Sequence, residues 1–194
     1  MYWKASRYII LSEFAQSGTH IDSPKVIDCA CGKGRGFPYI IKSLRPSTIV
    51  GVDNDKDQLT GATNTYLNRR WFHRIQLIRK DILKLRSKEK FDMFFCCETL
   101  EHLEKKSNKK VVKAILNAVK PGGKILISFP INERSIENPE HKQLLTEEEI
   151  FDHFGKRCIL LGKAYHMTEP TNKKKRDDCS FMVGFEKRKG VGLI

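Results

Sequence analysis

Short apolar runs alternate with amphipathic segments along most of the chain. Runs rich in β-branched and aromatic residues predict strands at residues 25–30, 48–52, 75–79, 91–97, 124–129, 158–165 and 180–186. Apolar residues at helical spacing predict helices at residues 37–44, 55–67, 109–119 and 146–154. Strands that alternate with helices indicate an α/β fold, in which helices cover both faces of a mostly parallel sheet.

The two ends of the chain depart from this alternation. The first 23 residues predict a helix whose inward face carries Trp3, Tyr8, Ile10, Leu11 and Phe14. The last two predicted strands have no helix between them, which predicts an antiparallel final strand in a doubly wound sheet of seven strands. We therefore expect a single domain over residues 1–194, with a helical cap at 1–24, a core at 25–155 and antiparallel strands at 156–194.

Three short patterns predict where helices begin and end. Asp55 with Gln58, and Thr146 with Glu149, have the spacing of a capping box at a helix N-terminus. The P-G-G triplet at residues 121–123 predicts the end of a helix and a turn into the next strand.

The turn after the first predicted strand says most about function. Residues 26–36 read V-I-D-C-A-C-G-K-G-R-G, and apolar residues at helical spacing follow. A strand, a tight turn and a helix start form the place where an open α/β sheet holds a nucleotide-like ligand. A dinucleotide loop, G-x-G-x-x-G counted from Gly32, would need glycine where this chain has Phe37. The pattern therefore argues against a dehydrogenase.

Several motifs in register resemble those of class I S-adenosylmethionine-dependent methyltransferases. D-x-A-x-G-x-G over residues 28–34 resembles the first motif of that family, which usually has glycine at the position of Ala30. Residues 91–103, F-D-M-F-F-C-C-E-T-L-E-H-L, resemble a segment of the broad subfamily that includes quinone-biosynthesis O-methyltransferases. K-P-G-G at residues 120–123 resembles the turn of the same family. The resemblance covers about residues 25–155 and implies a Rossmann-like fold with S-adenosylmethionine as cofactor.

The cofactor-binding residues follow from the strand ends and from the resemblance. An acid after the second strand can accept both ribose hydroxyls, and Asp53 stands there. The alternative, compatible with that role, is that Asp53 or Asn54 caps the next helix. Arg35 is a candidate partner for the cofactor carboxylate, or else an exposed charge at a helix start. The resemblance implies the cofactor-binding set Asp28, Ala30, Gly32, Gly34, Asp53, Asn54, Asp81, Ile82 and Cys97.

A methyltransferase needs a base only if its acceptor must lose a proton near the moment of attack. Glu98, His102 and His141 are the candidate catalytic residues, because they stand where the fourth and fifth strands open onto the expected site. Glu98, Glu101, His102 and His141 also resemble the E-x-x-E-H metal set of small-RNA 2′-O-methyltransferases. A divalent metal is not favoured, since the paired histidines of that subfamily are missing around His141 and His102 can instead cap its helix.

The formal net charge of +13 bears on partners. Basic clusters lie at residues 69–74, 105–110, 173–176 and 187–189. Such a surface attracts nucleic acid, anionic membranes or acidic substrates, and the alternative is a solvated lysine-rich surface. No stacking aromatics accompany the lysines, so nucleic acid stays an alternative partner beside a small-molecule acceptor.

The remaining composition points to an intracellular protein. No apolar run reaches the length of a membrane span, and residues 1–18 lack the pattern of a secretory signal. The six cysteines form no C-x-x-C pair, which disfavours a zinc site and indicates reduced thiols in a cytoplasmic protein.

The leading hypothesis is an S-adenosylmethionine-dependent methyltransferase that acts on oxygen or nitrogen of a small or polar acceptor. The alternatives are an RNA or DNA methyltransferase that uses the basic surface, and a non-catalytic module that binds the cofactor. The sequence does not indicate the acceptor or the oligomeric state.

Overall fold

A computed structural model describes residues 3–131, 137–167 and 179–190, without the side chains of residues 3–6 and 167. The first half contains α1 (Trp3–Gln16), β1 (Lys25–Cys29), α2 (Phe37–Leu44), β2 (Thr48–Asp53), α3 (Lys56–Tyr66), η1 (Phe72–Arg74), β3 (Ile75–Arg79), η2 (Ile82–Lys84) and β4 (Phe91–Cys97). The second half contains η3 (Leu100–His102), η4 (Lys105–Ser107), α4 (Asn108–Ala118), β5 (Val119–Pro130), α5 (Glu147–Phe154), β6 (Cys158–Met167) and β7 (Cys179–Lys187).

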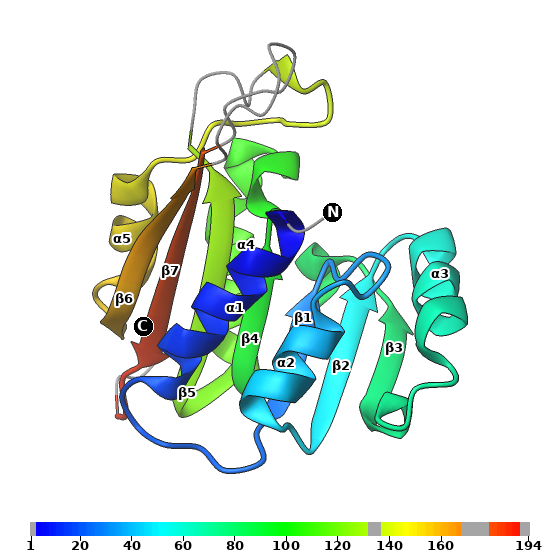
Figure 1. Cartoon of the computed structure of the whole chain (residues 1–194). Coiled ribbons are helices and arrows are strands. Elements are labelled where there is room, and N and C mark those ends of the chain that lie inside the picture. The colour runs from blue at the N-terminus through cyan, green and yellow to red at the C-terminus, as the bar shows by residue number, and fades with distance from the viewer. Residues whose placement is uncertain (1–2, 132–136, 168–178, 191–194) are drawn as a thin grey trace.

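The seven strands form one sheet in the order β3-β2-β1-β4-β5-β7-β6 (Figure 1). Strands β1 to β5 pair in parallel, whereas β7 runs antiparallel to both β5 and β6. The chain winds outward from β1 to β3 and then returns to β4 beside β1. The carboxyl ends of β1 and β4 therefore meet at the switch point, where sheets of this kind bind their ligands.

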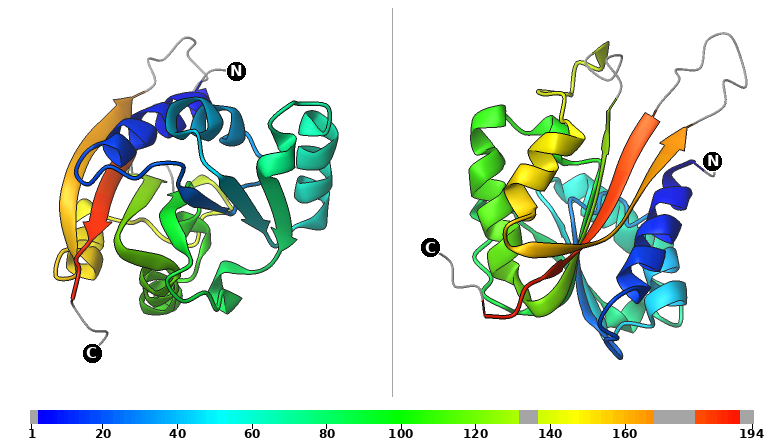
Figure 2. Two further views of the ribbon diagram at one scale, coloured as in Figure 1. Left: turned by 90° about the horizontal axis from the view of Figure 1, so that it is seen from below. Right: turned by 90° about the vertical axis from the view of Figure 1, so that its left-hand side faces the viewer.

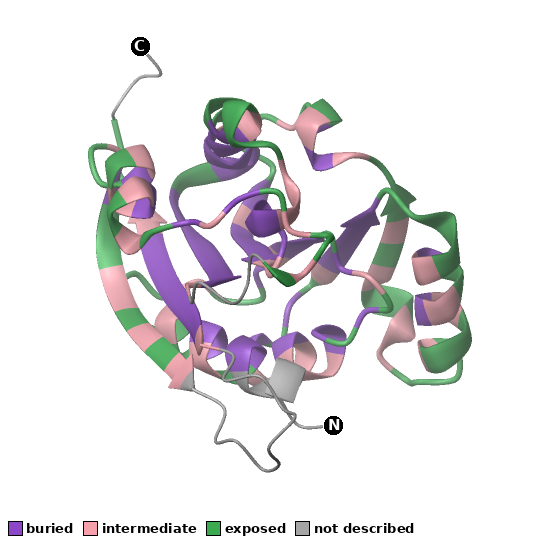
Figure 3. Ribbon diagram, turned by 90° about the horizontal axis from the view of Figure 1, so that it is seen from above, coloured by how far each residue is buried: buried purple, intermediate pink, exposed green. Residues whose placement is uncertain are grey.

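Helices cover both faces of the sheet (Figure 2). One core lies under α4 and α5, and includes Ile115 and Phe154. The other lies under α1, α2 and α3, and includes Leu11, Ile40 and Leu59. Seen from above, the central strands are buried, whereas the edge strands and the outer faces of the helices are partly exposed (Figure 3). The predicted seven-stranded α/β fold with an antiparallel final strand is confirmed.

The N-terminal helix packs on the sheet as its apolar face predicts. Tyr8 and Leu11 are buried, Ile10 and Phe14 pack at the margin of the same core, and the side chain of Trp3 lies outside the described residues. The buried Lys124 of β5 donates Nζ hydrogen bonds to the carbonyl oxygens of Ala15 and Ser17. Because these carbonyls lie at or just past the C-terminal end of α1, the lysine fixes that helix to the sheet.

The P-G-G triplet does not form the predicted turn. Residues 121–123 lie inside β5, where the register against β4 shifts between the pairs Phe91↔Val119 and Met93↔Lys124. Gly122 has φ +77°, and a Cβ on Gly123 would lie 2.8 Å from the carbonyl oxygen of Asp92. The triplet therefore forms an irregularity within a strand, which residues without a backbone donor or without a Cβ tolerate.

One of the two predicted capping boxes forms. Thr146 and Glu149 exchange both bonds, at 3.2 Å each. Asp55 caps α3 by accepting from the amides of Asp57 and Gln58, but the amide of Asp55 donates to Asp53 at 3.0 Å instead of to Gln58. The second box is therefore replaced by a contact that ties α3 to the end of β2.

Candidate functional site

The turn after β1 has left-handed backbone at three alternate residues. The φ angles are +58° at Ala30, +54° at Gly32 and +68° at Gly34. A Cβ on Gly34 would lie 2.4 Å from the ring of Phe37, so this glycine is required for packing of α2. A Cβ on Gly32 would meet only the side chain of Gln58, at 3.7 Å. Gly32 therefore leaves open space into which a ligand fits against the backbone.

Replacing Ala30 by glycine is expected to stabilise the protein. An alanine in the left-handed conformation costs about 1–2 kcal/mol, and glycine avoids this strain. Glycine also makes the unfolded chain more flexible, which lowers the stability of the folded state by about 0.5–1 kcal/mol. We expect Ala30→Gly to raise the free energy of unfolding by about 0.5 kcal/mol. The matched change Ala114→Gly inside α4 should lower it by about 1 kcal/mol. Urea denaturation measures both, and a loss at both positions would contradict the strain at Ala30.

Two adjoining cavities open at the carboxyl ends of the central strands, and both are lined by Ala30 and Glu98. The first, of about 340 Å³, is further lined by Arg7, Tyr8, Cys31, Gly32, Lys33, Arg35, Gln58 and Cys97. The second, of about 260 Å³, is further lined by Asp53, Asn54, Lys80, Asp81, Ile82, Thr99, His102 and Leu103. The structure thus brings most of the predicted cofactor-binding residues to one place, from four different strand ends.

Asp53 ties the turn after β1 to the start of α3. Its Oδ2 accepts from the amide of Gly32 at 2.7 Å, and its Oδ1 accepts from the amide of Asp55 at 3.0 Å. The side chain is nearly buried and borders the second cavity. Because one carboxylate holds two segments of backbone, Asp53 shapes the cavity as well as lining it.

The third strand end contributes Asp81 and Ile82 to the second cavity. Asp81 accepts a hydrogen bond from the amide of Leu83 at 2.8 Å and so caps η2. Ile82 is buried and gives the cavity an apolar wall. Asn54 borders the same cavity, and its carbonyl oxygen accepts from the guanidinium of Arg79 at 3.1 Å.

Asp28 and Gly34 line neither cavity. Asp28 is fully buried beneath the turn, where the Tyr8 hydroxyl lies 3.1 and 3.2 Å from its two carboxylate oxygens. Burial raises the pKa of Asp28 to about 7, against the lowering effect of the Tyr8 hydrogen bond. Burial, followed by the nearby Asp28 charge, raises the pKa of Tyr8 and that of the Cys97 thiol in the first cavity. Asp28 thus supports Tyr8, which lines the cavity in its place.

The buried Asp28 is expected to make stability depend on pH. The folded carboxyl binds a proton below about pH 7 and the unfolded one only below about its ordinary value of 3.8. Between these values the folded state holds more protons, so the free energy of unfolding falls as the pH rises, by about 4 kcal/mol in total. Urea denaturation from about pH 4 to about pH 8 should show this loss relative to Asp28→Asn, which cannot ionise. Parallel pH profiles of the two proteins would contradict it.

An ion pair missed by the sequence analysis links α1 to the end of β4. The Arg7 guanidinium lies 3.2 Å from Glu98 Oε2 and donates to the Ser180 hydroxyl at 2.8 Å. Ser128 donates to Glu98 Oε1 at 2.9 Å, and Glu98 has φ +49°. Arg7 is only 1% exposed. The sequence places Arg7 one turn before Leu11, on the inward face of the predicted helix, and this position could have indicated that Arg7 is buried.

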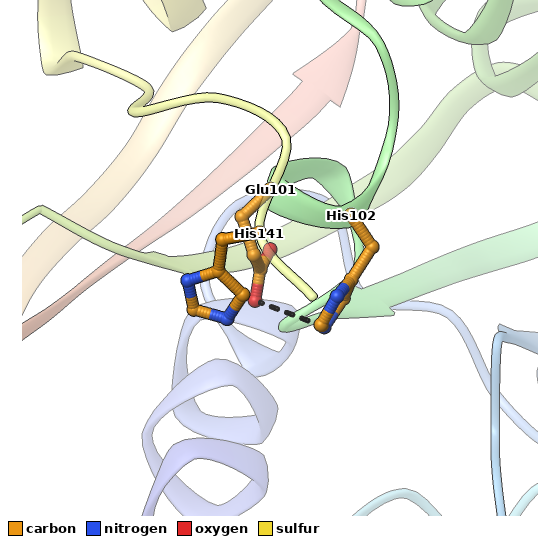
Figure 4. A group of neighbouring side chains, drawn as sticks. All are labelled: Glu101, His102 and His141. Atoms are coloured by element: carbon orange, nitrogen blue, oxygen red, sulfur yellow. Dashed lines mark ion pairs between the residues drawn. The ribbon is translucent and has the colours of Figure 1, made fainter. Parts of the chain in front are cut away.

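Glu101, His102 and His141 come together beside the second cavity (Figure 4). One ligand atom from each lies within 4.8 Å of the others, and His102 Nε2 is 3.9 Å from Glu101 Oε1. His102 Nδ1 donates to the carbonyl of Glu140 at 3.0 Å. In the described part of the chain Glu98 is not a member of this group, because its carboxylate is held by Arg7 and Ser128. Three of the four residues of the predicted metal set therefore converge.

The segment that carries His141 is fixed to η3 and α4. The amides of Lys142 and Gln143 donate to the carbonyl of Glu101, at 2.7 and 3.3 Å. The Gln143 side chain exchanges hydrogen bonds with Asn108 at 2.9 Å and donates to the Leu100 carbonyl at 2.8 Å. These contacts set the distance between His141 and His102, whose rings lie 4.9 Å apart.

Three further sequence expectations concern a basic cluster, the cysteines and membrane-spanning segments. The basic cluster at residues 173–176 lies outside the described residues. Each of the six cysteines is a free thiol. Among the helices that the structure describes, none combines the length and the apolar character that a membrane span requires.

Comparisons with known proteins agree with this geometry. Residues 26–123 match the family described as methyltransferase domain. A carboxy-S-adenosyl-L-methionine synthase of Trichodesmium erythraeum is 28% identical over 63% of this chain and 47% of its own length. A ubiquinone biosynthesis O-methyltransferase of Pseudomonas putida is 32% identical over 54% of this chain and 43% of its own length. The chain thus spans about half the length of the curated relatives it matches.

The fold is also shared with a solved structure. The N-methyltransferase NodS of Bradyrhizobium japonicum, in complex with S-adenosyl-L-homocysteine, superposes with a TM-score of 0.76 over 95% of this chain and 87% of its own. At 13% identity this likeness concerns the fold alone. The family match covers the turn after β1, the ends of β2 and β3, and the segment from Glu98 to His102. The resemblance found in the sequence is confirmed, and the chain belongs to the methyltransferase domain family of the class I, S-adenosylmethionine-dependent type.

Proposed function

We propose that this protein transfers a methyl group from S-adenosylmethionine to an oxygen or nitrogen atom of a small, polar acceptor. The observation that carries the proposal is the pair of adjoining cavities at the switch point of the sheet, joined at Ala30 and Glu98. The residues present suit the two halves of such a cofactor, and the open space above Gly32 admits its close approach to the backbone.

The second cavity suits the adenosine half. Asp53 offers the carboxylate acceptors that a ribose diol needs, and Asp81 offers an acceptor for an adenine amino group. Ile82 and Leu103 offer apolar contact to the flat faces of the base. The first cavity suits the amino-acid half, because Arg7, Lys33 and Arg35 provide cations for its carboxylate.

The chemistry depends mainly on placement. When bound, S-adenosylmethionine supplies a methyl group on an activated sulfonium with a neutral thioether as leaving group. Holding an acceptor in line with that group lowers the activation free energy by several kcal/mol, on the order of the gain measured for intramolecular reactions. A hydroxyl or ammonium acceptor also gives up one proton, which this chain must accept.

His102 is placed to accept that proton. Its Nδ1 donates to the Glu140 carbonyl, so in the neutral ring Nε2 carries the free lone pair. The ring borders the second cavity and is partly exposed, so a proton taken up at Nε2 can pass on to solvent. His141 supports this arrangement from the side of the 137–145 segment. Glu98 instead positions the junction of the two cavities, because its carboxylate is bound by Arg7 and Ser128.

Transfer of a labelled methyl group tests the proposal. The protein is incubated with methyl-labelled S-adenosylmethionine and a cell extract, and the products are separated into small molecules, protein and nucleic acid. We expect label in the small-molecule fraction, and slower transfer by His102→Gln at unchanged cofactor affinity. Label in nucleic acid alone would favour the alternative acceptor, and cofactor binding without any transfer would favour a non-catalytic module.

Metal-assisted transfer to vicinal hydroxyls is the second candidate, and one observation favours it. Glu101, His102 and His141 present ligand atoms within 4.8 Å of one another. Mixed carboxylate and imidazole ligands suit manganese, iron or cobalt better than magnesium. Calorimetry with Mn²⁺ should then show one site that His141→Ala removes, and activity should disappear with a chelator. Full activity in the presence of the chelator would reject this candidate.

A further inference from the structure

A third cavity is lined by residues of α4, of α5 and of the segment that follows α5. These two helices lie on the face of the sheet opposite α1 and α2 (Figure 2). The volume of the cavity is about 350 Å³, similar to that of the larger cavity at the strand ends. It has no lining residue in common with the two cavities proposed for methyl transfer. The residues that line it are Lys109, Val112, Lys113, Asp152, His153, Lys156 and Arg157.

The lining is strongly cationic. Four of these side chains carry a permanent positive charge, and Asp152 is the one acid among them. Lys109 and Lys113 stand one helical turn apart on α4. They therefore face the same side, with about 6 Å between their Cβ atoms. Val112 forms a buried apolar wall between them and the core. The cavity therefore concentrates positive charge in a concave surface, which strengthens the local field.

Three of the four cations, Lys109, Lys113 and Lys156, are not paired with an acid within residues 3–131, 137–167 and 179–190. Other lysines on the same molecule do pair, such as Lys105 with Glu149 at 2.7 Å and Lys163 with Glu147 at 2.6 Å. Because Asp152 is the one acid beside these cations, the like charges repel one another, and a ligand with several negative charges relieves that repulsion.

We propose that the cavity between α4 and α5 binds the phosphate backbone of a nucleic acid. Phosphate groups match lysine and arginine donors, and a chain of them engages several cations at once. A membrane surface fits less well, because the cavity is concave and Val112, its apolar lining residue, is buried. The site is separate from the proposed methyl-transfer cavities, so it concerns a binding partner whichever acceptor is methylated.

Fluorescence anisotropy with an end-labelled single-stranded RNA tests this site. The cavity variant carries Lys109→Ala, Lys113→Ala and Lys156→Ala. The control carries Lys42→Ala, Lys56→Ala and Lys88→Ala, three exposed lysines that line none of the three cavities. Both proteins lose three positive charges. We expect the cavity variant to bind at least about tenfold more weakly, with the slope of log K against log salt reduced by about 2. The control should stay within about threefold of the original protein.

Three results would overturn the proposal. Equal losses in both variants would mean diffuse attraction by net charge, and no RNA binding by the original protein would mean no such site. Binding of inorganic tripolyphosphate or of anionic vesicles without binding of RNA would assign the cations to another phosphate source. The affinity of the same variants for S-adenosylmethionine, measured by calorimetry, should equal that of the original protein. A failure of the nucleic-acid proposal is therefore distinguishable from a failure of the proposed methyl transfer.

Discussion

Replacing Asp53 by alanine is expected to weaken S-adenosylmethionine binding about 100-fold or more. The carboxylate accepts from the amides of Gly32 and Asp55, and its remaining lone pairs border the second cavity. Hydrogen bonds to a charged group contribute about 1.5–3 kcal/mol each, and two lost ribose contacts correspond to about two decades of affinity. Release of the turn at Gly32 adds to this loss, because the same substitution removes the anchor of the backbone that faces the cofactor.

Calorimetry on matched variants separates these causes. Asp53→Asn keeps one oxygen acceptor and should bind with intermediate affinity. Asp57→Ala removes a nearby exposed acid of α3 and should bind as the original protein does. Thermal unfolding reports whether Asp53→Ala remains folded. An affinity for Asp53→Ala within about threefold of the original, in a folded protein, would reject the ribose role.

Breaking the pair of Arg7 and Glu98 is expected to destabilise the fold by about 3 kcal/mol. Arg7 is 1% exposed and the Glu98 side chain 20%, so removing one partner leaves the other charge poorly solvated. Arg7→Met keeps most of the apolar stem and removes the charge. The loss should fall at the lower end of the range of about 3–5 kcal/mol for buried pairs, because Ser128 still donates to Glu98.

A double-mutant cycle measures this interaction directly. Urea denaturation of Arg7→Met, Glu98→Gln and the double variant should give a coupling free energy of about 1–3 kcal/mol. Lys42→Met, at an exposed position of α2, is the control and should change stability by less than about 0.5 kcal/mol. Additive losses in the cycle would mean that the two side chains do not depend on one another.

The order of elements was predictable because each local signal agreed with the fold. The ranges predicted for α2, β3 and β4 match the structure, since apolar periodicity and flanking turn residues mark both ends of each. The turn predicted at the P-G-G triplet was wrong, because these residues favour a turn and equally suit an irregular strand beside β4. The choice between a turn and a strand depends on how the segment pairs with Phe91 and Met93 of β4. This pairing cannot be predicted from the sequence of the segment alone.

The clustering of the proposed cofactor-binding residues was predictable at the strand ends and not beyond them. Asp53, Asp81 and Ile82 follow parallel strands, so the topology alone brings them to one edge of the sheet. Arg7 was missed because its partner Ser180 stands 173 positions away, on a strand whose place beside β5 the sequence does not specify. The resemblance to the E-x-x-E-H set included Glu98 in the candidate metal group, whereas the backbone at that residue is left-handed and its carboxylate pairs with Arg7.

Calorimetric titration of the purified protein with S-adenosylmethionine, and separately with NAD, decides which cofactor the cavities at the strand ends bind. We expect one site for S-adenosylmethionine, competition by S-adenosylhomocysteine, and no heat with NAD, because Phe37 fills the space beside Gly34 where a dinucleotide loop has its third glycine. No heat with S-adenosylmethionine, or binding of NAD in its place, would mean that these cavities are not an S-adenosylmethionine site.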